Sequence, residues 1–260
     1  MAIKDKWIDF NGTDGYVNAG RGIEAYTITQ AITLEAWILP DTYVANRVMG
    51  VISKLQTSTS PSSGYGLLVV DGKLRLEFYD TAGTLRQLQS QTAMSANAWH
   101  HVAATFDGAT IRLYVDGAEV ISSNVGSATI GHSSEAELWI GRGPGGYFKG
   151  NMCEARIWSV ARTATQILND QLASPDASVA GLNARWPLDD GSTLYANDSR
   201  NGLKATLLGS AIPGSTLTTT TVDPQPTMQA PTALINTSSV LNAALDKLNR
   251  KSVMELLKQL

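Results

Sequence analysis

Short apolar runs separated by turn residues recur along residues 1–160, and in some of them, such as 110–115, apolar residues alternate with other residues, which is typical of a strand that buries one face. Residues 66–70 form an uninterrupted apolar run, residues 74–79 form an alternating one, and Asp71-Gly72 separates the two. An Asp-Gly pair between two apolar runs predicts a β-hairpin, because the turn needs positive φ angles. The same dipeptide recurs twice between residues 107 and 117. Many short strands with almost no helical period predict an all-β sandwich or jelly roll.

A helical pattern first appears at residues 163–170, where Thr163 is a suitable N-cap. We expect a short helix lying against the sandwich. Strand-like runs resume at 184–188 and 203–208, and residues 1–210 are therefore predicted to form one domain. Residues 211–233 are rich in threonine and proline, a composition that builds no core and predicts an extended linker.

In the tail, residues 234–260, apolar residues recur at the spacing of one face of an α-helix. Ser252 and Glu255 have the spacing of a capping box, so the tail predicts a pair of short amphipathic helices rather than one long helix. Helices this short need a partner for their apolar faces: each other, the sandwich, or another chain, including a second copy of this one. The predicted assembly residues are Leu241, Leu245, Leu248, Val253, Leu256, Leu257 and Leu260.

Composition and charge exclude some classes of partner. The formal net charge is −3, which does not favour nucleic acid. No apolar run is long enough to predict a membrane span. The first residues lack the pattern of a signal peptide, and Cys153 is the single cysteine, so both features favour synthesis and folding in the cytoplasm. The final location, for which a virion surface is one candidate, is a separate question.

A series of motifs then occurs in a recognisable order. The segments are residues 7–17, 34–38 (LEAWI), 99–108 (WHHVAATFDG), 113–117 (LYVDG), 138–142 (LWIGR) and 154–158 (EARIW). This series resembles the laminin-G-like family of concanavalin A-like jelly rolls and covers about residues 7–172. The resemblance implies a concanavalin A-like jelly-roll sandwich. We expect Trp37 and Trp99 to fill its core.

Catalytic patterns are missing from the sequence. Glucanases of this superfamily carry a strand with Glu-x-Asp-x-x-Glu, and no Glu-x-Asp occurs in this chain. His100 and His101 are adjacent, so on a strand they face opposite sides and cannot hold one metal ion together. The Gly-x-Gly-x-x-Gly pattern at residues 141–146 is interpreted as a turn, because a strand rather than a helix is expected after it. We therefore predict that the protein is not an enzyme.

The family resemblance also implies a candidate calcium site. Members often hold one Ca²⁺ on a rim, and Asn11 and Asp14 of the first turn are the matching ligands here. Where members commonly carry an aspartate before Glu154, this chain has Cys153, which weakens the calcium prediction. Because Cys153 alternates with Ala155 and Ile157, we expect it to face inward as a small hydrophobic residue.

Ligands of the family bind to loops at the rim of the sandwich. The corresponding loops here are 43–47, 56–64, 79–86 and 143–149. They offer the stacking and hydrogen-bonding groups that sugars or acidic partners need, and the predicted ligand-binding residues are Tyr43, Arg47, Tyr79, Arg86, Tyr147 and Lys149.

Two functional hypotheses follow. The first is a non-catalytic recognition module that binds a glycan or a cell-surface protein and is displayed from a larger assembly. The alternative is a structural virion component, such as a phage capsid decoration or tail protein, anchored to other subunits by its C-terminal helices. A glycan-processing enzyme is a distant third, because no carboxylate pair for it is found.

Overall fold

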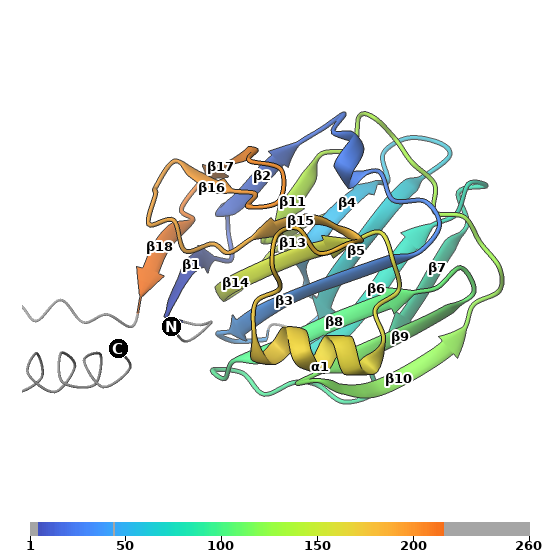
Figure 1. Ribbon diagram of the computed structural model, residues 1–260, viewed down its shortest axis with the longest axis horizontal. Coiled ribbons are helices and arrows are strands. Elements are labelled where there is room, and N and C mark those ends of the chain that lie inside the picture. Colours follow the sequence, from blue (N-terminus) through green and yellow to red (C-terminus); the bar gives the residue numbers. More distant parts are fainter. Residues whose placement is uncertain (1–4, 44, 216–260) are drawn as a thin grey trace, which may run out of the picture. The chain divides into compact units, whose positions relative to one another are not determined.

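The computed structural model describes residues 5–43 and 45–215. Within them two large antiparallel sheets face each other (Figure 1). The strands of the first, sheet A, are β1 (Lys6–Asn11), β3 (Ile32–Pro40), β8 (His100–Phe106), β9 (Thr110–Val115), β10 (Ala118–Asn124), β14 (Lys149–Trp158), β15 (Leu182–Trp186) and β18 (Ile212–Ser215). Their order is β10-β9-β8-β3-β14-β1-β18, and β15 also pairs with β14.

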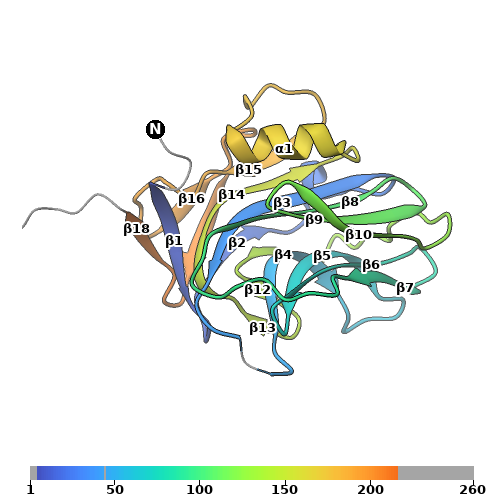
Figure 2. The ribbon, with the colours of Figure 1, turned by 90° about the horizontal axis from the view of Figure 1, so that it is seen from below.

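Sheet B is the second layer. Its strands are β2 (Tyr16–Gly20), β4 (Val48–Gln56), β5 (Ser63–Val70), β6 (Lys73–Tyr79), β7 (Leu85–Gln89), β11 (Leu138–Ile140), β16 (Tyr195–Asn197) and β17 (Lys204–Leu208). Their order is β16-β17-β2-β11-β4-β5-β6-β7. A short hairpin of β12 (Arg142–Gly143) and β13 (Gly146–Tyr147) lies against β4, on the side of sheet B away from sheet A (Figure 2). The expected all-β sandwich of antiparallel sheets, consistent with a jelly roll, is therefore confirmed.

The core lies between the sheets and follows the alternation of the sequence. On β3, for example, Ile32, Leu34, Ala36 and Ile38 are fully buried in it. Asp71-Gly72 and Asp116-Gly117 have positive φ at both residues, as predicted for hairpin turns. The third Asp-Gly pair differs, because there the Asp107 side chain accepts N–H bonds from Ala109 and Thr110.

The predicted helix is α1 (Ala164–Leu172), which lies on the outer face of sheet A (Figures 1 and 2). Thr163 is its N-cap as expected, and it forms a reciprocal capping box with Gln166. A 3₁₀ turn, η1 (Glu24–Tyr26), precedes β3. The Gly-rich pattern at 141–146 forms the β12–β13 hairpin, so interpreting it as a turn was correct.

Two predictions about the core were wrong: that Trp37 and Trp99 fill it, and that Cys153 faces it. Trp37 and Cys153 are buried, but they pair with each other outside the core between the sheets. Trp37 does not face this core because its neighbours Ala36 and Ile38 do, and Cys153 does not because a β-bulge with positive φ at Glu154 shifts the register of β14. An inserted residue reverses which face later side chains occupy, so Ala155 and Ile157 face inward while Cys153 does not. Trp99 is partly exposed and packs edge-on against Trp7.

The sandwich continues past residue 210. Residues 212–215, predicted as the start of the linker, form β18 and pair with β1 from Lys6 to Asp9. The prediction missed this strand because Thr/Pro-rich composition gives no signal of pairing with a strand two hundred residues earlier. The rest of the predicted linker and the predicted helical tail, with all its assembly residues, lie outside the described residues.

Candidate functional site

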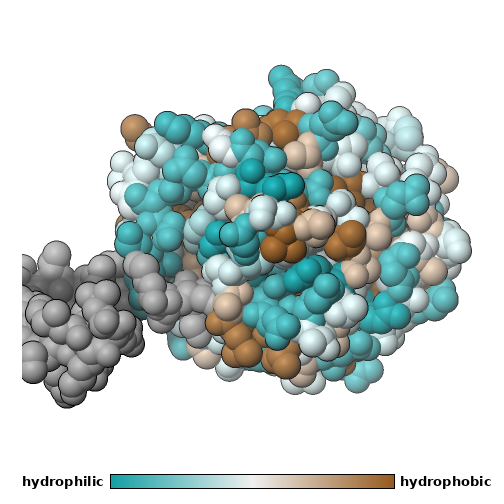
Figure 3. Space-filling view, viewed as in Figure 1, coloured by the Kyte–Doolittle hydropathy of each residue, from teal (hydrophilic) through white to brown (hydrophobic). Residues whose placement is uncertain are grey.

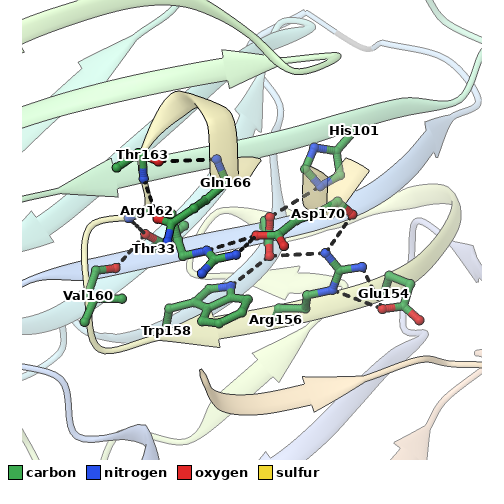
Figure 4. Close-up of polar contacts among 11 residues, drawn as sticks. Thr33, His101, Glu154, Arg156, Trp158, Val160, Arg162, Thr163, Gln166 and Asp170 are labelled. Carbon is green, nitrogen blue, oxygen red and sulfur yellow. Dashed lines mark hydrogen bonds and ion pairs between the residues drawn. The ribbon is translucent and has the colours of Figure 1, made fainter. Parts of the chain in front are cut away.

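A buried polar network joins α1 to sheet A (Figure 4). Arg156 of β14 is its centre: the guanidinium donates to Glu154 at 2.8 and 3.0 Å, to Glu35 at 3.2 Å and to the backbone carbonyl of Asp170 at 3.1 Å. Trp158 Nε1 donates to Glu35 at 2.7 Å. His101 Nε2 lies 3.4 Å from the second oxygen of Glu35. The segments that carry the family resemblance supply most of these groups.

The carboxylates of Glu35 and Glu154 in this network form ion pairs with arginine side chains. Burial alone would raise the pKa of Glu35, but Arg156 and contacts from His101 and Trp158 lower it to about 2. Glu154 also has a lowered pKa, despite its burial, because Arg185 and Arg156 hold it. Both acids are covered by protein and paired. They therefore build the fold and do not form a carboxylate pair open to a substrate.

The predicted calcium residues form a closed turn instead. Asn11 Oδ1 accepts N–H bonds from Thr13, Asp14 and Gly15, and its amide donates to Asp14 at 2.7 Å. Asp14 also accepts from Ser210, and the bonds from Asn11 and Ser210 lower its pKa. An amide oxygen faced by three N–H groups has no lone pair left for a cation. The Asn11 oxygen therefore does not fit a calcium ion in this turn.

Other groups were sought across the described residues. In that part of the chain, no three His, Cys, Asp or Glu side chains gather so as to hold a metal ion. The same residues contain no helix that is both long and apolar enough to cross a membrane.

The four predicted ligand loops lie at two opposite ends of the sandwich. Loops 56–64 and 79–86 meet where β4 ends and β5 begins, while loops 43–47 and 143–149 meet at the start of β4. At the first end, hydroxyl-bearing residues of 59–63 and 129–134 surround two adjoining hollows of about 510 and 570 Å³ that share Asp80 and Thr81. The lining is polar, and no aromatic ring except that of His132 contributes to it.

Several predicted ligand residues have structural partners. Arg86 of β7 pairs with Asp80 at 3.0 Å and donates to the carbonyl of Val125, which ties the β6–β7 turn to the loop after β10. Lys149 pairs with Asp41 at 2.8 Å. Tyr43 packs against the core, and this burial raises its pKa to about 12. Tyr79 and Arg47 are partly exposed at opposite ends of the sandwich.

Tyr147 belongs to a different arrangement, a cluster of three aromatic rings on the outer face of sheet B. Tyr16 of β2 packs against Trp139 of β11 and Tyr147 of β13, with ring centroids 6.2 and 6.0 Å apart. The Arg142 guanidinium lies over all three rings, 4.1 Å from the Trp139 centroid, 4.7 Å from Tyr16 and 5.3 Å from Tyr147. Such distances are those of cation–π contacts, which hold the guanidinium in place.

Polar groups lie beside these rings. Glu137 Oε2 accepts from Trp139 Nε1 at 3.0 Å and from Asn18 Nδ2 at 3.2 Å. All six side chains are partly exposed. We call this set the Arg142 platform; its members are Tyr16, Asn18, Glu137, Trp139, Arg142 and Tyr147. Apolar ring faces next to a guanidinium, an amide and a carboxylate can bind a molecule that is apolar on one side and rich in hydroxyl groups on its edges.

Sequence reasoning found only Tyr147 of this platform. A signal for two others was available: Leu138 and Ile140 are core residues, so Trp139 between them must face outward, and Tyr16 precedes core residue Val17. That β2 and β11 are neighbours, and that the β12–β13 hairpin folds back onto them, is known only from the structure.

The opposite face of the sandwich, which carries α1, differs. Leu168 and Leu172 of α1 are exposed, but the hydrophobic patches on this face are separated by hydrophilic and neutral residues (Figure 3). This face therefore offers scattered apolar side chains.

Comparison with known proteins agrees with this architecture. A candidate carbohydrate-binding protein from Bacteroides ovatus is similar in structure, with a TM-score of 0.62 and 23% identity over 82% of this chain. The matched region spans 60% of that protein's length. The heptameric SAP-like pentraxin of Limulus polyphemus has a TM-score of 0.51 and 17% identity, covering 83% of this chain and 97% of that one. At these identities the likeness shows the fold alone.

No curated protein matches the sequence. The family profile described as "Concanavalin A-like lectin/glucanases superfamily" matches residues 11–168, which is more than half of the chain. The motifs, the two-sheet architecture and this match agree, and the chain belongs to the concanavalin A-like lectin/glucanases superfamily.

Proposed function

We propose that this protein is a non-catalytic recognition module that binds glycans on the Arg142 platform. The observation that carries the proposal is the set of three partly exposed aromatic rings around one arginine, with Asn18 and Glu137 beside them. Sugars present C–H faces that stack on aromatic rings and hydroxyl groups that bond to such polar side chains. The fold shared with a candidate carbohydrate-binding protein of Bacteroides ovatus supports the same proposal.

The non-catalytic part of this proposal is supported by the contacts that the glutamate side chains make. Glu35 and Glu154 are buried and paired with arginines, and Glu137 is hydrogen-bonded to Trp139 and Asn18. A glycosidase needs one acid and one base or nucleophile on either side of the scissile bond. The platform supplies a single carboxylate, so it suits binding without cleavage.

Replacing Trp139 by alanine tests the platform. We expect glycan affinity to fall by about tenfold or more, because a central aromatic contact contributes about 1.4 kcal/mol or more to binding. A glycan array identifies the ligand, and titration calorimetry then compares the variants. Trp99→Ala is the matched control, since Trp99 is also partly exposed but lies against Trp7, away from the platform. An array signal that never exceeds background, or equal losses for both variants, would count against the proposal.

We also propose that residues 234–260 attach the module to other subunits, including further copies of this chain. The apolar residues of this segment at helical spacing motivate the proposal. Light scattering should show the full chain as a multimer and a chain ending at Thr218 as a monomer. The truncation must retain β18, because removing it would expose the edge of β1. If both chains are monomers, self-association through the tail is ruled out.

A further inference from the structure

A second cation–π contact, between a lysine and a tyrosine, lies on the same outer face of sheet B as the Arg142 platform. Lys204 Nζ of β17 lies 4.2 Å from the ring centroid of Tyr195 on β16. Ala196, Ala205 and Leu207 point into the core, so Tyr195 and Lys204 face outward like the platform. These two strands come after residue 168 and thus lie outside the region that the family profile matches.

The strand register connects this pair to the platform. Tyr195 pairs with Thr206, Thr206 with Asn18, and Asn18 with Trp139, so four side chains form one row across four neighbouring strands. Neighbouring strands are about 4.8 Å apart, which places the two ends of the row about 14 Å apart. That length suits a trisaccharide rather than a single sugar.

Both cations are without an acidic partner. Across the described ranges, no carboxylate oxygen lies within 4.0 Å of the charged nitrogens of Arg142 or Lys204. The acids nearest to these two cations in the sequence have other donors: Glu137 accepts from Trp139 and Asn18, and the buried Asp198 accepts from Tyr26 and Asn201. Arg142 and Lys204 therefore contact aromatic rings but no acid among the described residues, so each can still pair with an anionic group of a ligand.

We propose that the platform, extended by Tyr195 and Lys204, binds an acidic oligosaccharide whose sugars carry carboxylates. Arg142 pairs with a carboxylate at one end, where its planar fork matches the two oxygens, and Lys204 pairs with a carboxylate at the other. Thr206 and Asn18 lie between them and bond to hydroxyl groups of the central sugar. This proposal rests on the proposed function and names the class of glycan.

Titration calorimetry with the full chain tests the charge and the length separately. The probes are a trimer of galacturonic acid, the corresponding neutral galactose trimer, a sulfated galactose trimer and galacturonic acid itself. We expect the uronate trimer to bind at least about tenfold more tightly than the neutral trimer or the single sugar, and its affinity to fall as salt screens the partly exposed charges.

Lys204→Gln then locates the second contact. We expect about five- to tenfold weaker binding of the uronate trimer and no change for the single sugar, because only the trimer reaches Lys204. Arg112→Gln removes the same charge from an exposed ion pair on sheet A and should leave both affinities unchanged.

Each failure has a distinct meaning. Equal binding of the neutral and uronate trimers, or an unchanged affinity in Lys204→Gln, would overturn this inference while a loss of binding in Trp139→Ala still upheld glycan recognition. Tighter binding of the sulfated trimer would overturn the carboxylate assignment. If no saccharide binds at all, the inference and the proposed function fail together.

Discussion

Replacing Arg156 by methionine is expected to lower the free energy of unfolding by about 3–5 kcal/mol at pH 7, because removing one partner leaves a buried charge without compensation. Arg156 is fully buried and bonds to Glu35, Glu154 and the backbone of Asp170. Glu154 keeps Arg185 in the variant, whereas Glu35 loses the one arginine that pairs with it among the described residues. Urea unfolding followed by tryptophan fluorescence measures the change.

The effect of this substitution depends on pH with a defined sign. The folded-state pKa of Glu35 is about 2, below its ordinary value, so its contribution to stability is present above about pH 4.5 and is lost as pH falls toward 2. Without Arg156, burial raises the pKa of Glu35 instead, and the buried acid becomes easier to accommodate when protonated. The stability difference between the two proteins should therefore be smaller at pH 4 than at pH 7.

Two further variants check the interpretation. Glu35→Met together with Arg156→Met should recover part of the lost stability, because no unpaired charge then stays buried. Arg112→Met, on an exposed ion pair, should change the free energy of unfolding by about 0.5 kcal/mol or less. A loss in Arg156→Met no greater than that of Arg112→Met would contradict the role of the network.

Replacing Gly50 of β4 by alanine should displace the β12–β13 hairpin and so disturb the Arg142 platform. A Cβ atom on Gly50 would lie 2.1 Å from the carbonyl carbon of Arg142 and 2.2 Å from the nitrogen of Gly143. These are backbone atoms, so relief requires the β12–β13 hairpin to move away from β4, and the hairpin carries Arg142 and Tyr147. We expect about tenfold weaker glycan binding and a destabilisation of about 1–3 kcal/mol.

Gly66→Ala is the matched control for that experiment. Gly66 lies on the adjoining strand β5, and there the new Cβ would meet the end of the Leu55 side chain at 2.8 Å, which can rotate aside. Calorimetric titration and thermal unfolding of both variants give the comparison. Unchanged glycan binding in Gly50→Ala would show that the hairpin position does not matter for the ligand.

The sequence was most informative about local structure. Alternation with a period of two predicted the strands, Asp71-Gly72 and Asp116-Gly117 predicted tight turns, and Thr163 predicted the start of α1. These features depend on residues close together in the chain, and their physical causes, φ preferences and orphan N–H groups, act locally. The ordered motifs extended this to the family and the sandwich architecture.

Sequence reasoning failed where the position of a side chain depends on strand register or on contacts with distant segments. Because of the bulge at Glu154, Cys153 faces the opposite side of the sheet from Ala155 and Ile157. The sequence pattern around Glu154 gives no sign of this extra residue. Among the predicted ligand residues, Arg86 and Lys149 have carboxylate partners and Tyr43 is packed against the core. A loop position makes such residues accessible in principle, but neighbouring segments determine which groups they contact.

The sequence by itself therefore determined most of the elements before residue 210, the all-β class, the family and the outward direction of side chains such as Trp139. Only the tertiary structure decided which outward side chains are neighbours: Tyr16, Trp139, Arg142 and Tyr147 on one face, and Glu35, His101, Glu154 and Arg156 under α1. The physical reason is that side-chain alternation fixes a face but not a partner. Partners follow from the order and register of strands, which are set by packing between segments far apart in the chain.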